Sequence, residues 1–193
     1  MSSTPPSVSS IGSPEPEPCP NEGTPPLGAP GSVNDAEGII RLVPSRVWLI
    51  RDGRGNAALG PTAFSRDELS QRKGKSASVL RDMTASAEIE RRARALNSEP
   101  LWVDDPVIAT ASVFAVRHIV DSGGRREVCV NADPTSKEND RLGPCSTHAS
   151  VVRACPPLDQ KQRIEWAGLR QQLAMRFSRV THVSGRTVDV TNL

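Results

Sequence analysis

Asp133 and His148 are two residues whose types and setting could carry out acid–base chemistry. Each lies near the end of a strand that the sequence predicts, and a polar loop over residues 132–147 separates the strands. A carboxylate beside an imidazole orients the ring and moves its pKa towards neutrality, as a general acid or base requires. We therefore treat Asp133 and His148 as catalytic candidates. The dipeptide Asp133-Pro134 is also a frequent turn initiator, which is the structural alternative.

A basic segment over residues 72–76 offers contact with phosphate. Its Gly74-Lys75-Ser76 end resembles that of a phosphate-binding loop, but the glycine that such a loop needs five residues earlier is Leu69 here. The segment therefore does not predict a nucleotide site. Its cations could still neutralise phosphates, or they could form a solvated charged surface. The phosphate-binding candidates are Arg72, Lys73 and Lys75.

The cysteines raise the question of a metal or a disulfide. Cys145 and His148 have a short ligand spacing, and zinc accepts a Cys₃His set that Cys129 and Cys155 would complete. A strong zinc signature has two close pairs, however, and Cys129 alternates with valines as a buried strand residue does. We assign no metal ligand and no cofactor. Cys19 falls in a Pro-rich segment, and no secretory signal is visible, so we expect reduced thiols.

The charge and hydropathy of the chain exclude a membrane-spanning protein. The longest nearly apolar run covers residues 107–116, whereas a transmembrane helix needs about 20 residues. The 193 residues carry a formal charge of +2, which favours no particular partner. Beyond residue 35, 24 basic residues face 18 acidic ones, which permits a nucleic-acid partner without requiring one. We expect a cytoplasmic protein with another protein as partner and no membrane contact.

The amino-terminal residues differ in composition from the rest. Nine of the 17 prolines fall within the first 35 residues, which contain no Lys or Arg. Proline lacks a backbone donor and keeps the preceding residue out of the helical region. We expect residues 1–36 to be a disordered tail and residues 37–193 to form one domain.

The hydrophobic patterns of the domain mix strands and helices without a regular βαβ alternation. We expect strands at residues 39–43, 46–50, 77–81, 107–120, 126–131 and 148–154, and helices at 84–97 and from Asp159 onward. Residues 107–120 and 126–131 read as a hairpin, with His118 as a structural residue on one strand face. Trp166, Leu169, Leu173 and Phe177 form a core stripe on the second helix. The fold class is α+β, a small mixed or antiparallel sheet with two helices behind a disordered tail.

Several short motifs follow one another between residues 39 and 152. They are Arg41 with Trp48, Ala63-Phe64, Ser78-Val79, Asp133-Pro134 and His148-Ala149. In these motifs the chain resembles a group of small uncharacterised bacterial and phage proteins. The resemblance implies a bacterial or phage origin and a cytoplasmic setting, and it implies no activity.

Two functions from different classes remain open. The first is an accessory or interaction protein that docks on a partner through an edge strand or through the Trp166 helix. The second is a small enzyme with Asp133 and His148 as acid–base residues, acting on a phosphate-bearing or nucleic-acid substrate. In that enzyme the phosphate contacts would come from Arg72, Lys73 and Lys75. Because no recognisable catalytic motif is present, the sequence favours the first function.

Overall fold

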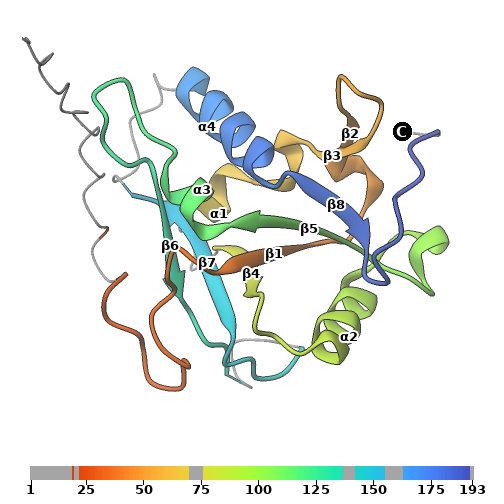
Figure 1. The fold of residues 1–193 in the computed structure, drawn as a ribbon, viewed down its shortest axis with the longest axis horizontal. Helices are drawn as coiled ribbons and strands as arrows, with labels where there is room; N and C mark the ends of the chain where they lie inside the picture. Colours follow the sequence, from red (N-terminus) through yellow and green to blue (C-terminus); the bar gives the residue numbers. More distant parts are fainter. Residues whose placement is uncertain (1–18, 20–21, 70–75, 137–141, 155–162, 192–193) are drawn as a thin grey trace, which may run out of the picture.

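Six antiparallel strands form the main sheet, in the order β6-β7-β4-β1-β5-β8 (Figure 1). The computed structural model describes residues 19, 22–69, 76–136, 142–154 and 163–191. The strands of the main sheet are β1 (Gly38–Val43), β4 (Ala77–Arg81), β5 (Val107–Ser112), β6 (Val128–Ala132), β7 (His148–Arg153) and β8 (Arg179–His182). A two-stranded sheet consists of β2 (Leu49–Arg51) and β3 (Ala57–Leu59). The expected α+β fold with an antiparallel sheet is confirmed.

Helices cover both faces of the main sheet. They are α1 (Arg66–Leu69), α2 (Ser86–Leu96), α3 (Val113–Arg117) and α4 (Arg163–Arg176), with 3-10 turns η1 (Arg46–Trp48), η2 (Pro61–Ala63) and η4 (Pro100–Trp102). In Figure 1, α2 and α4 lie on opposite sides of the sheet. Among the described residues, none of these helices has the length and apolar character of a membrane span.

Alternation along the strands divides the core between these two faces. In β1, Ile39 and Val43 belong to the large core that also contains Trp166 and Leu169 of α4. Ile40, which points the other way, packs with Leu80 and with Ile89 of α2. Because successive strand side chains point to opposite faces, this parity extends to every strand of the sheet. We call the face that α2 contacts the α2 face.

The expected strand over residues 107–120 is wrong beyond Ser112. The Ser112 hydroxyl accepts a hydrogen bond from the Ala115 N–H and caps α3, so the apolar run continues as a helix. His118 is therefore the residue that ends α3, where its ring stacks on Phe114. The expected hairpin is confirmed only at its turn, where Val120 and Arg126 form an antiparallel bridge. The long strand pairing is wrong, because β5 pairs with β1 and β8 while β6 pairs with β7.

The structure also revises the interpretation of residues 46–50. They begin with η1, which Ser45 caps by accepting a hydrogen bond from the Val47 N–H, and only Leu49 and Ile50 of this range belong to a strand, β2. The stripe of α4 is buried as expected, with Trp166 3%, Leu169 2%, Leu173 0% and Phe177 2% exposed. The expected start of that helix at Asp159 lies outside the described residues.

Part of the expected tail is packed on the domain. Residues 1–18 and 20–21 lie outside the described residues. Cys19, Glu22 and Val33 are all buried, and Val33 belongs to the large core. The described portion of the Pro-rich segment therefore contributes to the folded structure.

Candidate active site

His148 has a defined partner on each ring nitrogen. Its Nε2 atom lies 2.5 Å from Oγ of Ser78, and its Nδ1 atom lies 2.6 Å from the main-chain oxygen of Asp133. A carbonyl oxygen only accepts hydrogen bonds, so the Nδ1 atom carries the proton. In the neutral ring Nε2 is then an acceptor, and the Ser78 hydroxyl donates to it.

The strand registers bring these three residues together. Ser78 pairs with Ser150 and Leu80 pairs with His148 across β4 and β7, so Ser78 and His148 are diagonal neighbours on the α2 face. A side chain as long as histidine reaches across such a diagonal. Asp133 directly follows β6, and its N–H donates to the His148 carbonyl oxygen at 3.1 Å. The end of the β6–β7 ladder therefore positions Asp133 beside the ring.

A chain of hydroxyl groups holds the Asp133 carboxylate. The Ser150 hydroxyl donates to Oδ2 of Asp133, and the oxygens of Ser150 and Ser76 lie 2.8 Å apart. Because a carboxylate only accepts, the single proton of the Ser150 hydroxyl points to Asp133, and the Ser76 hydroxyl then supplies the proton of the Ser76–Ser150 contact. The same Oδ2 lies 3.8 Å from Nδ1 of His148, which is too long for a hydrogen bond. The carboxylate therefore acts on the ring through charge, and most strongly when the ring is protonated.

The Ser78 hydroxyl and the His148 imidazole differ in solvent exposure. Ser78 is exposed, whereas 8% of the His148 side chain is accessible. A solvent-facing hydroxyl with an oriented imidazole behind it is the arrangement of a nucleophile and its general base. The predicted Asp133–His148 pair is thus brought together, and Ser78 is the partner that the sequence analysis missed. Its signal was weak, since the dipeptide Ser78-Val79 is too short to indicate a nucleophile.

Arg41 fixes the main chain of Ser78. The β1–β4 ladder ends at the Ile40–Leu80 pair, and the 3% exposed Arg41 lies just beyond this point. Its NH1 atom donates to the Ser78 carbonyl oxygen at 2.8 Å. Its NH2 atom donates to the Ala63 carbonyl oxygen at 2.8 Å and to Glu68 Oε1 at 3.0 Å. A buried cation therefore holds the strand that carries the hydroxyl.

The surroundings of Arg41 form one wall of an open pocket. The guanidinium lies 4.9 Å from the ring centroid of Trp48. Burial raises the pKa of Glu68, but the Arg41 charge and the Ser65 hydrogen bonds outweigh it and hold the pKa below its ordinary value. The pocket has a volume of about 510 Å³ and is lined by Trp48, Thr62, Ser65, Glu68 and Ser76. Ser76 thus belongs both to the pocket and to the hydroxyl chain of Asp133.

Several residues of the short sequence motifs lie in one connected set. Arg41 contacts the rings of Trp48 and Phe64 and the main chain of Ser78. Ser78 contacts His148, which contacts Asp133. Residues spread over more than 100 positions of the sequence therefore meet around this site.

A second histidine, His182, makes the same contacts with an aspartate and serves as a structural comparison for the His148 site. His182 Nδ1 lies 2.6 Å from the main-chain oxygen of Asp105 and 4.0 Å from its Oδ2. Ser184, two residues after His182, donates to that carboxylate as Ser150 does to Asp133. Arg186 also pairs with Asp105, and no described hydroxyl contacts Nε2 of His182. The Ser78 hydroxyl is therefore the feature that distinguishes the His148 site.

The expectation of reduced thiols is wrong for two cysteines. Cys19 and Cys129 form a disulfide across 110 positions of the sequence, which their spacing did not indicate because Cys19 was assigned to the tail. Cys145 is free and buried, and Cys155 lies outside the described residues.

No ligand set for a metal is available among the described residues. Their one group of close candidate ligands is Cys19, Glu22 and Cys129, in which the two sulfurs are bonded and arginines hold the carboxylate. Arg72, Lys73 and Lys75, the expected phosphate contacts, lie outside the described residues.

Comparison of the chain with protein-family models, with curated proteins and with solved structures found no match. The geometry around Ser78, Asp133 and His148 is therefore the basis for a functional proposal.

Proposed function

We propose that the protein is a small serine-dependent enzyme that hydrolyses esters, with Ser78 as nucleophile and His148 as general base. The observation that carries this proposal is the 2.5 Å contact from Ser78 Oγ to Nε2 of a ring whose Nδ1 is bound to a carbonyl oxygen. The second contact leaves Nε2 free to take a proton, and the first places the hydroxyl proton next to it.

The reaction proceeds in two halves. Ser78 Oγ attacks the electrophilic atom of the ester while its proton moves to Nε2, and the resulting imidazolium is stabilised by the carbonyl oxygen and carboxylate of Asp133. His148 then returns the proton to the leaving oxygen as the ester bond breaks. In the second half, water attacks the Ser78 ester while its proton moves to His148. The bond to Oγ then breaks, the acid leaves, and His148 returns the proton to Oγ to restore the hydroxyl.

A phosphate-bearing ester is the substrate class that we favour. Arg72, Lys73 and Lys75 directly precede Ser76 in the sequence, and Ser76 lines the pocket beside the site. The excess of basic residues beyond residue 35 also attracts an anionic substrate.

The test is turnover of p-nitrophenyl acetate, p-nitrophenyl phosphate and bis(p-nitrophenyl) phosphate by the wild-type protein and two variants. Removing the nucleophile in Ser78→Ala should lower kcat about 1,000-fold or more. Ser184→Ala, which removes the equivalent carboxylate donor at the His182 site, is the matched control and should retain activity. Absence of turnover on all three esters, or full activity in Ser78→Ala, would contradict the proposal.

An interaction function is the second candidate, and an edge strand of the sheet favours it. Docking through the Trp166 face of α4 has no support, because that face packs on the core. The β6 edge is the better surface, and a partner protein would pair with it.

The Cys19–Cys129 disulfide supports an oxidising compartment over the expected cytoplasmic setting.

A further inference from the structure

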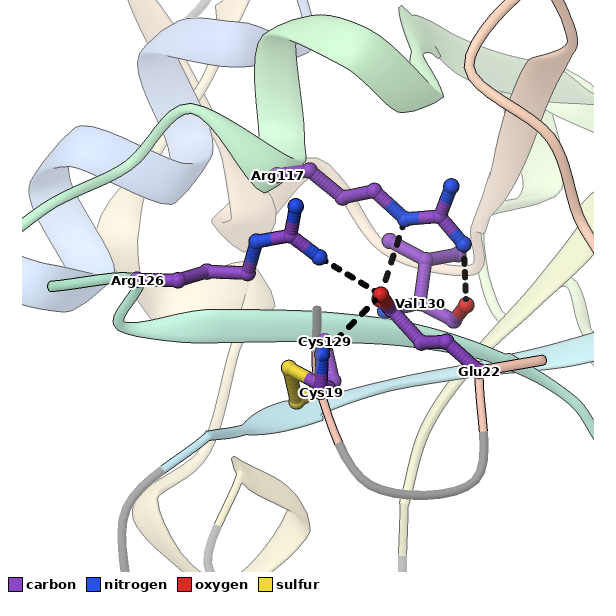
Figure 2. Close-up of a disulfide and its surroundings, with 6 residues drawn as sticks. All are labelled: Cys19, Glu22, Arg117, Arg126, Cys129 and Val130. Atoms are coloured by element: carbon purple, nitrogen blue, oxygen red, sulfur yellow. Dashed lines mark hydrogen bonds and ion pairs between the residues drawn. A yellow bond between two sulfur atoms is a disulfide. The ribbon is translucent and has the colours of Figure 1, made fainter. Parts of the chain in front are cut away.

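The outer edge of β6 is occupied by two residues from the amino-terminal part of the chain. We call Cys19 and Glu22 the head. Cys19 is bonded to Cys129 of β6, and Figure 2 shows the Glu22 carboxylate between Arg117, Arg126 and Val130. Its Oε1 atom lies 2.9 Å from Nε of Arg117 and its Oε2 atom lies 2.5 Å from NH1 of Arg126.

The head takes the place of a neighbouring strand at one point of this edge. The Val130 N–H donates to Glu22 Oε1 at 2.9 Å, and the Val130 carbonyl oxygen accepts from Arg117 NH2 at 3.0 Å. An unpaired edge exposes such groups and invites another chain to pair with them. Here a carboxylate and a guanidinium satisfy both groups.

Two attachments hold the head among the described residues: the disulfide and the Glu22 carboxylate. The next residues, 23–28, are all exposed. Firm anchoring begins again beyond them, where Val33 is 3% exposed and Glu37 makes a two-pronged ion pair with Arg81. The head is therefore separated from its anchor by an exposed connection.

Arg117 keeps other partners without the head. Arg117 also binds Asp35 at 2.7 Å and the Val33 carbonyl oxygen at 2.9 Å, and both partners belong to the anchored part. Loss of Glu22 would therefore leave Arg117 in position beside the Val130 N–H and the buried Arg126. Such a donor set recognises a carboxylate.

We propose that Arg117, Arg126 and the Val130 N–H form a carboxylate-binding site on the β6 edge, which Glu22 fills in the oxidised protein and which opens to an acidic peptide when a dithiol reduces the Cys19–Cys129 disulfide. The dithiol attacks one sulfur as a thiolate, releases the other cysteine, and then closes its own disulfide, so that two electrons and two protons pass to the cysteines. The occupant is an extended acidic segment because β6 offers main-chain pairing beside the two cations.

The test measures binding of a fluorescein-labelled peptide by fluorescence anisotropy to the full chain. The peptide spans residues 16–26 with Cys19→Ser, and the control peptide adds Glu22→Gln. Protein is used oxidised, reduced with dithiothreitol, and as Cys19→Ser/Cys129→Ser. We expect binding to the reduced and doubly substituted proteins at least about tenfold tighter than to the oxidised protein, and about tenfold weaker binding of the control peptide.

Hydrogen exchange separates opening from unfolding. On reduction, exchange at the Val130 amide should accelerate while the amides of β5 stay protected. Equal peptide affinity in all three proteins, equal affinity of the control peptide, or loss of β5 protection would overturn the proposal. Dimers that exchange heads would also overturn it, because the occupant would then be a second copy of this chain.

Discussion

The Ser78 hydroxyl and the His148 imidazole face each other across β4 and β7, with 2.5 Å between Oγ and Nε2. Two strands that pair antiparallel fix this contact, so it does not depend on a loop to bring the groups together. A site on paired strands is held more precisely than one on loops.

Asp133→Asn should lower activity only moderately. The main-chain oxygen of Asp133 would still hold the Nδ1 proton, while the charge that stabilises the imidazolium would be lost. Because the carboxylate is exposed, we expect a loss of about tenfold in kcat with little change in KM. Steady-state kinetics measure both constants, and a loss as large as that of Ser78→Ala would show that the carboxylate itself fixes the ring.

Arg41→Met should destabilise the protein strongly. The substitution leaves the Ser78 and Ala63 carbonyl oxygens and the ionised Glu68 without their buried partner. Breaking such a pair costs about 3 kcal/mol in the free energy of unfolding. Urea denaturation of this variant should show the loss, and Arg41→Met/Glu68→Gln should recover part of it. A stability equal to that of the wild type would contradict the role assigned to Arg41.

Loss of the disulfide should lower the free energy of unfolding, because the bond closes a long loop. A link across 110 positions restricts the unfolded chain, and its removal should cost about 2–4 kcal/mol. Denaturation of the wild-type protein and of Cys19→Ser, each with and without dithiothreitol, tests this value, because the reductant should destabilise only the wild type. Cys145→Ser is the control, because Cys145 is the described free cysteine and should leave the reductant effect unchanged.

Asp105 should contribute to stability in acid. Burial raises its pKa, but hydrogen bonds from Ser184 and Arg186 together with the His182 charge lower it to about 2, from an ordinary value of 3.8. The folded state therefore binds this proton less readily than the unfolded state, and the contribution is present above pH 4 and lost as pH falls towards about 2.

Asp105→Asn should remove this contribution, about 1 kcal/mol after solvent screening of the exposed Arg186. The deficit should be present at pH 6 and shrink between pH 4 and pH 2. The neighbouring Asp104→Asn removes the same charge and serves as control. A deficit that is constant with pH would show that the carboxylate acts through packing alone.

The sequence predicted those parts of the fold and site that depend on local pattern. Short local runs of residues predicted β1, β4 and β7, and the helical stripe predicted the buried face of α4. Asp133 and His148 were found because both residue types are chemically distinctive and lie at strand ends, Asp133 after β6 and His148 at the start of β7. Strand pairing was not predictable in the same way, since β6 pairs with β7 rather than with the nearer β5.

Ser78 and the disulfide depend on contacts between distant residues. Ser78 is 70 positions from His148, and only the β4–β7 register makes them neighbours. The prediction of a strand beyond Ser112 was wrong for a local reason. The apolar run around it fits a strand or a helix, and one side-chain cap decides between them.

Covalent labelling with a fluorophosphonate, which reacts with activated serines, tests the central claim most directly. After digestion, mass spectrometry should find the phosphonyl adduct on Ser78 in the wild-type protein, and labelling should fall about 100-fold or more in His148→Gln because the base is lost. His182→Gln should label like the wild type. An unlabelled Ser78, or labelling that does not depend on His148, would contradict the account.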